Sequence, residues 1–141
     1  AAWVHDAEAE SDRPNHYATS SDGGATWTAP ASTGLQGQTL TPWPLPDGRV
    51  LCVYRRMDRP GLWAVTCRVE QDRWTVEEQT PLRGADAAGL TSTDPNMSAA
   101  FGSLRFGAPC ITPLNEAEYF VAFWCYEDCV SVIRWYQVAV S

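Results

Sequence analysis

Apolar and polar residues alternate along this chain in short runs that are separated by turn residues. The segments 50–54 (V-L-C-V-Y) and 62–69 (L-W-A-V-T-C-R-V) are nearly all apolar, which is typical of buried strands. Ten Pro and ten Gly interrupt the chain too often for long helices. We therefore expect an all-β fold, which could be a sandwich, a barrel or a propeller. The expected strands are 3–6, 16–20, 27–33, 41–45, 50–54, 62–69, 76–82, 119–124 and 130–140.

Polar segments between these runs predict the turns and loops. Asp47-Gly48 lies between two apolar runs, and this dipeptide strongly favours a tight hairpin turn. Three longer polar stretches are expected to be loops, namely 7–15, 55–61 and 125–129.

The most specific motif is S-S-D-G-G-A-T-W at positions 20–27, with the pattern S-x-D-x-G-x-x-W. Asp22 is suited to accept hydrogen bonds from backbone N–H groups just downstream. Gly24 permits a positive φ, and Trp27 is expected to begin the returning strand and wedge against its neighbours. This pattern, with Ser20 at its start, resembles the Asp box of the sialidase (bacterial neuraminidase repeat) superfamily. The alternative is an ordinary hairpin followed by a chance Trp.

The resemblance implies a six-bladed β-propeller, of which this chain would hold about half, in the C-terminal portion of the ring. The approximate units are 1–38, 39–83 and 108–141, with a long connection at 84–107. Trp74-Thr75 repeats Trp27-Thr28 at a spacing of 47 residues, as a degenerate copy of the box. The third unit stops after its third strand, so we expect the remaining blades to be needed for closure of the ring.

In sialidases the active site lies on the face away from the Asp boxes, so the box residues Ser20, Asp22, Gly24 and Trp27 are expected to be structural. The family binds the substrate carboxylate with three Arg and uses a Tyr nucleophile that a Glu activates. The loops expected on the opposite face supply our candidates. Substrate binding is assigned to Arg55, Arg56, Asp58, Arg59 and Arg105, and catalysis to Tyr126 and Glu127. The alternatives are a solvated loop with a surface ion pair for the arginines, and a structural role for the Tyr–Glu pair.

Charge and cysteine content narrow the choice of partners and cofactors. The net charge is −7, which argues against nucleic acid because phosphate binding needs a basic face. Five Cys and two His show no zinc-ligand spacing, so we expect no metal and no cofactor. Free buried thiols are favoured over disulfides, although Cys52 with Cys67, and Cys110 with Cys125, could be neighbours across strands. No run is long enough to span a bilayer, and the family resemblance favours a secreted or periplasmic location.

Three functional hypotheses follow from these observations. The first is a sialidase-like, glycan-processing propeller, an exo-glycosidase that releases terminal sialic acid or a related acidic sugar. The second is a non-catalytic Asp-box propeller that binds carbohydrate or protein, because a fold does not decide an activity. The third is a non-functional fragment, because an open arc of blades exposes strand edges.

Overall fold

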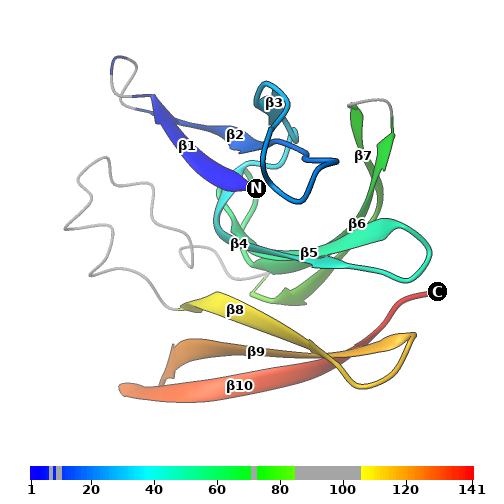
Figure 1. Ribbon diagram of the computed structural model, residues 1–141. Helices are drawn as coiled ribbons and strands as arrows, with labels where there is room; N and C mark the ends of the chain where they lie inside the picture. The colour runs from blue at the N-terminus through cyan, green and yellow to red at the C-terminus, as the bar shows by residue number, and fades with distance from the viewer. Residues whose placement is uncertain (7, 9–10, 71–72, 85–105) are drawn as a thin grey trace.

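The computed structural model describes residues 1–6, 8, 11–70, 73–84 and 106–141, and within these residues it is all-β without a helix. The described strands form antiparallel sheets that lie beside one another (Figure 1). The first sheet contains β1 (Ala2–Asp6), β2 (Ser11–Tyr17) and the short β3 (Ala31–Ser32). The middle sheet contains β4 (Gly37–Pro44), β5 (Arg49–Arg56), β6 (Leu62–Glu70) and β7 (Arg73–Arg83). The third sheet contains β8 (Phe106–Pro113), β9 (Glu118–Glu127) and β10 (Val130–Ala139).

Each of these sheets keeps its strands in sequence order, β1-β2-β3, β4-β5-β6-β7 and β8-β9-β10. Every connection inside a sheet is therefore of the hairpin kind, between neighbouring antiparallel strands. None of the three sheets closes on itself within the described residues.

The two central strands of the middle sheet, β5 and β6, are buried on both faces. In β5 every residue from Leu51 to Arg56 is buried, and successive side chains point to opposite faces. Leu51 and Val53 belong to a core cluster shared with the third sheet. Cys52 and Tyr54 belong to a second cluster on the other face. The third-sheet members of the first cluster are Phe106, Ile111, Tyr119, Val121, Phe123 and Cys125.

The first sheet meets the second of these clusters through an aromatic contact. Trp74 of β7 packs against this cluster, and its ring centroid lies 5.1 Å from that of Tyr17 in β2. The buried Asn15 side chain adds two hydrogen bonds, to the carbonyl oxygens of Leu35 at 2.9 Å and Gly37 at 3.0 Å. The middle sheet therefore lies between the first and third sheets.

The strand registers define two ends of the molecule. Gly37 pairs with Arg56, Leu62 with Arg83, and Phe106 with Cys125, so these residues mark the end where β5, β7 and β9 finish. We call it the arginine end. The opposite end, which we call the turn end, holds the turns β4–β5, β6–β7 and β8–β9. The loop at 20–27, whose sequence resembles an Asp box, lies between β2 and β3 and, by the direction of β3 toward β4, is at the turn end. This arrangement agrees with the interpretation that the box and the arginines are on opposite sides.

The Asp box is a loop braced by its own side chains. Asp22 accepts hydrogen bonds from the Ser20 hydroxyl at 2.8 Å, the Thr26 backbone N–H at 2.9 Å and the Thr26 hydroxyl at 2.5 Å. Gly24, with φ of 92°, donates its N–H to the Ser20 hydroxyl at 2.8 Å. The indole N–H of Trp27 closes the loop on the Gly24 carbonyl at 3.0 Å. The expected hydrogen bonds to Asp22 and the positive φ of Gly24 are thus confirmed.

The position of Trp27 corrects the sequence interpretation. Its side chain is 63% exposed, so it covers its own loop and does not wedge against neighbouring strands. The returning strand is limited to Ala31–Ser32, where residues 27–33 were expected. Trp74, its expected repeat, lies within β7 and packs on Tyr17. The two tryptophans therefore have different environments.

Two expected loops are strands for most of their length. The segment 7–15 contributes Ser11–Asn15 to β2, although it lacks an apolar alternation. In the segment 125–129 only Asp128 and Cys129 form the turn, and both have positive φ, 48° and 65°. This is the conformation of a two-residue type I′ hairpin, which usually carries Asn-Gly or Asp-Gly and so gave no sequence signal here.

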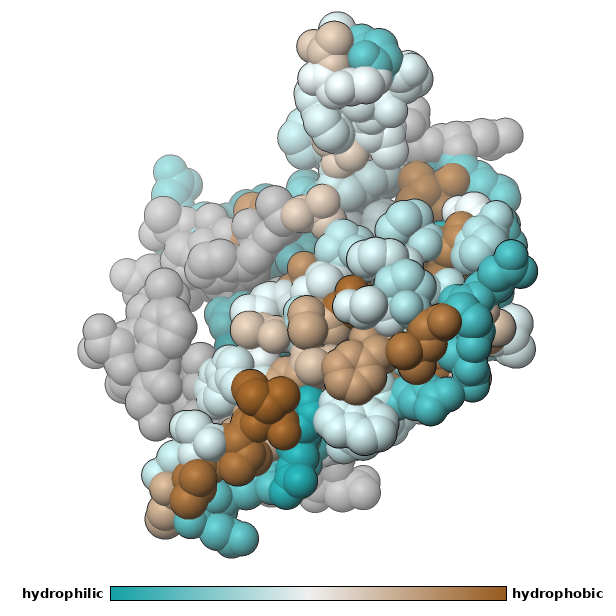
Figure 2. All heavy atoms as spheres, turned by 60° about the horizontal axis from the view of Figure 1, so that its bottom comes forward, coloured by the Kyte–Doolittle hydropathy of each residue, from teal (hydrophilic) through white to brown (hydrophobic). Residues whose placement is uncertain are grey.

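The third sheet has an uncovered apolar face. Figure 2 brings this side of the molecule forward and shows a band of apolar atoms across it. Ile133 is 68% exposed and Trp135 is 59% exposed, and the Trp135 ring stacks on Phe120 with centroids 5.4 Å apart.

Gly37 provides a test of the packing at the start of β4. A Cβ added there would lie 2.3 Å from the Arg55 carbonyl oxygen and 2.5 Å from the Tyr54 ring. We expect Gly37→Ala to lower the free energy of unfolding by about 1–3 kcal/mol, because buried backbone must move. The measurement is urea denaturation. The matched control is Gly107→Ala, whose Cβ would meet Trp124 at an ordinary 3.5 Å. Equal stability of the two variants would contradict this packing.

The Asp22 carboxylate provides a test of the Asp box. Its pKa is lowered from 3.8 to about 2, first by the Thr26 hydroxyl, then by the Thr26 N–H and by Ser20. A carboxyl group with a lowered folded-state pKa stabilises the fold above its unfolded pKa, and this contribution is lost as pH falls from about 4 toward 2. We expect Thr26→Ala to raise the Asp22 pKa more than Ser20→Ala, and Ser21→Ala to leave it unchanged. NMR titration of the Asp22 carboxyl carbon measures all three. An unchanged pKa in Thr26→Ala would show that the brace does not form.

Candidate functional site

Arg56 is the centre of a polar network at the arginine end. Its guanidinium donates to Asp58 through Nε at 2.8 Å and to the Gln79 side-chain oxygen at 2.7 Å, and it lies 4.9 Å from the centroid of the Trp63 ring. Burial alone would raise the pKa of Asp58, but the hydrogen bond and charge of Arg56 outweigh it and lower that pKa. The same hydrogen bond raises the pKa of Arg56. Arg56 therefore joins β5 to the following turn, to β6 and to β7.

Arg55 occupies a different face of the sheet. It is 3% exposed and its guanidinium contacts the side-chain oxygen of Gln38 in β4. Arg55 and Arg56 are consecutive strand residues, so their side chains point to opposite faces. The expectation of a loop at 55–61 is thus wrong for its first two residues, which β5 holds in its buried ladder. Arg59 lies exposed in the turn, and Arg105 lies outside the described residues.

Glu127 forms a second charged cluster at the same end. Its carboxylate pairs with Arg83 at the end of β7 and with Arg134 of β10, whose Nε lies 3.0 Å away. The hydrogen bond from Arg134, together with the charges of Arg83 and Arg134, lowers the pKa of Glu127 to about 2. The Cys125 thiol lies 3.6 Å from the same carboxylate, and burial raises the pKa of this thiol. The cluster ties the middle sheet to the third sheet.

The candidate catalytic pair is adjacent in sequence but divided by the sheet. Tyr126 and Glu127 are consecutive in β9 and so direct their side chains to opposite faces. Tyr126 is 39% exposed. A carboxylate with a pKa of about 2 is a weak proton acceptor near neutral pH, where an effective general base has a pKa close to the working pH. The catalytic assignment of these two residues stays a prediction.

Several polar residues at this end were not among the predicted site residues. Gln38 and Gln79 contact the two arginines of β5 from 17 and 23 positions away, and no local pattern marks such distant partners. Arg134 reaches Glu127 because the two-residue turn at 128–129, which gave no sequence signal, folds β10 back along β9. Arg83 sits where β7 ends, beside the third sheet.

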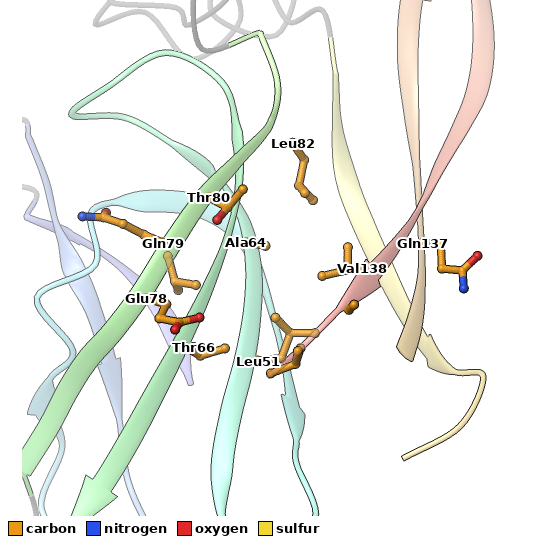
Figure 3. Close-up of a pocket in the computed structure, with 12 residues that line it drawn as sticks. Leu51, Ala64, Thr66, Glu78, Gln79, Thr80, Leu82, Gln137 and Val138 are labelled. Carbon is orange, nitrogen blue, oxygen red and sulfur yellow. The ribbon is translucent and has the colours of Figure 1, made fainter. Parts of the chain in front are cut away.

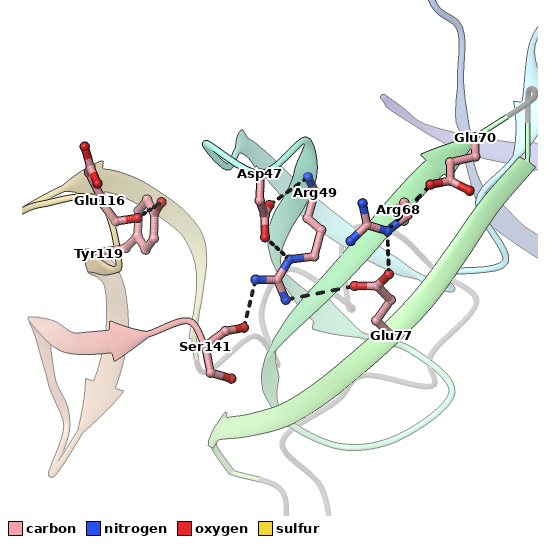
Figure 4. A network of polar contacts seen from close by, with 8 residues as sticks. All are labelled: Asp47, Arg49, Arg68, Glu70, Glu77, Glu116, Tyr119 and Ser141. Carbon is pink, nitrogen blue, oxygen red and sulfur yellow. Dashed lines mark hydrogen bonds and ion pairs between the residues drawn. The ribbon is translucent and has the colours of Figure 1, made fainter.

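The turn end carries a third polar network. Arg49 donates to Asp47 at 2.6 Å and to the backbone oxygen of Ser141 at 2.8 Å, and its guanidinium lies 3.9 Å from Glu77 (Figure 4). These contacts join the β4–β5 turn to β7 and to the last residue of the chain. A hollow of about 640 Å³ lies at the same end, and it is lined by Trp43, Pro44, Leu45, Pro46, Pro113, Leu114, Asn115, Glu116 and Tyr119.

A cavity of about 240 Å³ lies between the middle and third sheets (Figure 3). Leu51, Ala64 and Leu82 line it from the middle sheet, and Val138 and Val140 line it from the end of the chain. The predicted site residues do not line this cavity, but Gln79, which accepts a hydrogen bond from Arg56, does.

The five cysteines are free thiols, as predicted, but only Cys52, Cys67 and Cys125 are buried, whereas Cys110 and Cys129 are exposed. Cys52 and Cys67 are both buried in the second cluster, and a hydrogen bond between the two thiols raises the pKa of Cys52. Cys110 pairs with Ala122 rather than with Cys125. Among the described residues, no group of three His, Cys, Asp or Glu side chains is placed to hold a metal ion. The described part of the chain also has no helix that is long and apolar enough to cross a membrane.

Comparison with known proteins finds a similar solved structure but no matching family. No family model matches the chain, and no curated protein matches it. The crystal structure of a protein of unknown function from Dyadobacter fermentans is similar, with a TM-score of 0.60 and 23% sequence identity. The match covers 88% of this chain and 30% of that chain, so this chain spans less than a third of the length of that protein. The likeness shows that this arrangement of sheets occurs in a solved structure.

Arg56 provides a test of the network at the arginine end. We expect Arg56→Ala to lower the free energy of unfolding by about 2 kcal/mol, because Asp58 and Gln79 lose a charged hydrogen-bond donor and the Trp63 contact is lost. Arg59→Ala is the matched control, and its exposed side chain should change stability by less than about 0.5 kcal/mol. Both values come from chemical denaturation at neutral pH. If the two variants were equally stable, Arg56 would not organise this end.

Proposed function

We propose that this chain forms part of a sialidase-like Asp-box β-propeller and that the protein acts on glycans with a terminal acidic sugar. The observation that carries the proposal is the braced loop at 20–27. Its carboxylate accepts the hydrogen bonds expected from the pattern, its Gly24 has the expected positive φ, and its indole closes the loop on the Gly24 carbonyl.

The order of the sheets supports the propeller. Three successive antiparallel sheets follow one another along the chain, and the middle sheet is covered by a sheet on each face. The first strands of the middle and third sheets, β4 and β8, contact each other, and the Thr41 hydroxyl donates to the Pro109 carbonyl at 2.7 Å. A propeller packs its blades face to face with their first strands innermost, and it needs four to eight of them.

The chemistry of the arginine end supports an acidic ligand. Arg59 is exposed, and the Arg134 side chain is 54% exposed although it pairs with Glu127. A guanidinium group can bind a carboxylate with two parallel hydrogen bonds, which suits the carboxylate of sialic acid. In this proposal Arg134 joins the predicted substrate-binding residues, and Tyr126 and Glu127 remain the candidates for catalysis.

A second candidate function is a propeller that binds glycans without cleaving them. The specific observation in its favour is the state of the charged groups. Arg56 is engaged by Asp58 and Gln79, and the pKa of Glu127 is about 2, which is far below the range of a general base. The hollow beside Trp43 at the turn end offers an aromatic surface on which a sugar ring could stack.

Two parallel measurements on the full-length protein that carries this chain separate these functions. The first is the release of the fluorophore from a fluorogenic sialoside. The second is the binding of sialylated and desialylated glycans. We expect release of the fluorophore, reduced about 10- to 100-fold by Arg134→Ala, since one charged hydrogen bond contributes about 1.5–3 kcal/mol and each 1.4 kcal/mol is about tenfold in rate. Arg13→Ala, at an exposed arginine of β2, is the control. Binding without release would favour the second candidate, and neither binding nor release would contradict both.

A further inference from the structure

Two hairpin corners meet at the turn end and enclose the hollow of about 640 Å³ described above. One corner, residues 43–46, lies at the β4–β5 turn, and the other, residues 113–116, lies at the β8–β9 turn. The corners are equivalent, because the N–H groups of Leu45 and Leu114 each donate across their own turn at 2.8 Å. Within the described residues, the lining comes from these corners and from Tyr119, so β10 takes no part in it.

Hydrogen bonds hold both walls of the hollow in place. The Thr41 hydroxyl donates to the Pro109 carbonyl at 2.7 Å and joins β4 to β8. The Asn115 side-chain oxygen accepts two backbone N–H groups of its own turn, each at 2.9 Å. The Tyr119 hydroxyl donates to the Glu116 carbonyl at 3.2 Å (Figure 4). The hollow is therefore formed without a ligand, as small-molecule sites usually are.

Most of the lining is apolar. Leu45 and Tyr119 are buried members of the core cluster that the middle and third sheets share. Trp43 packs against this cluster but is only partly buried, and Leu114 is 53% exposed. The other apolar residues of the lining are Pro44, Pro46 and Pro113. These surfaces suit the apolar body of a small molecule.

Glu116 is the charged residue of this lining. Its side chain is exposed, and in the described part of the chain its carboxylate has no ion pair or hydrogen bond. Arg49, the nearest cation of the network in Figure 4, pairs with Asp47 and lies 3.9 Å from Glu77. The hollow therefore combines apolar walls with one carboxylate that a ligand can reach.

The two ends of the molecule differ in the sign of their charge. At the turn end the described carboxylates outnumber the guanidinium groups, whereas the reverse holds at the arginine end. The carboxylates of the turn end are Asp22, Asp47, Glu70, Glu77, Glu116 and Glu118, and its guanidinium groups are Arg49, Arg68 and Arg73. A surface of one sign attracts ligands of the opposite sign. The hollow at the turn end therefore favours a cation.

We propose that this hollow binds an organic ammonium ion. The charged nitrogen pairs with Glu116, and the ring or chain that carries it packs on Trp43 and Leu114. An indole ring attracts an ammonium group through its electron-rich face, so the aromatic residue and the carboxylate act together. An amino sugar and an alkylammonium ion are two sources of this chemistry. The proposal concerns the turn end and does not depend on acidic sugars at the arginine end.

The test compares each cation with a neutral counterpart of the same ring size. Saturation-transfer NMR on the full-length protein that carries this chain measures the binding of glucosamine and glucose, and of cyclohexylammonium and cyclohexanol, slightly below neutral pH. We expect a cation to bind about fivefold more tightly than its counterpart, as for a solvent-accessible ion pair. A preference shown by glucosamine alone identifies an amino sugar, and one shown by cyclohexylammonium alone identifies an alkylammonium ion.

Two variants locate the binding site. Glu116→Gln should remove the preference for the cation and leave binding of the neutral compound unchanged. Glu78→Gln is the matched control, because it makes the same change in net charge at an exposed residue of β7 outside the hollow. Equal binding of cations and neutral compounds, or equal effects of the two variants, would overturn the proposal. Loss of sialoside binding with ammonium binding intact would contradict only the proposed function.

Discussion

The structure depends on the burial of both faces of the middle sheet. A strand alternates its side chains between two faces, so a run in which every residue is buried, as in β5, needs a packed layer on each side. The third sheet supplies one layer through Val121 and Phe123, and the first sheet supplies part of the other through Tyr17. The position of the two outer sheets follows from this single requirement.

The same requirement explains the chemistry of the arginine end. Arg55 and Arg56 are the last residues of β5, and both are buried in the sheet. A buried guanidinium group must be paired and hydrogen-bonded. Asp58 pairs with Arg56, and Gln38 accepts a hydrogen bond from Arg55. Arg55 and Arg56, which were predicted to bind a substrate, therefore also hold strands together. Arg59 and Arg134 are more exposed to solvent.

Local patterns in the sequence were sufficient for the apolar strands and for turns that need special residues. The strands around 50–54 and 62–69, the hairpin at Asp47-Gly48 and the hydrogen bonds of Asp22 follow from alternation, Gly and Asx chemistry. The polar strand β2 was missed because its residues lack an apolar face that a pattern could reveal.

Tertiary context decided what these patterns could not. Trp27 is exposed because no strand among the described residues covers its loop, and the burial of Arg56 depends on Gln79, 23 residues away. The turn at Asp128-Cys129 adopts positive φ without glycine, so β9 continues to Glu127, three residues beyond its expected end at position 124. The described candidate residues of the loops 55–61 and 125–129 thus lie at one end of the sheets, but most of their contacts could not be read from the sequence.

Native-state hydrogen exchange tests most directly whether the doubly covered middle sheet is the centre of the fold. The amides of Cys52, Val53 and Tyr54 should exchange only through global unfolding, with a protection free energy equal to that from denaturant unfolding. The amides of β10 that point away from β9 should exchange much faster. Exchange of the β5 amides at the rate of the β10 edge would contradict the account.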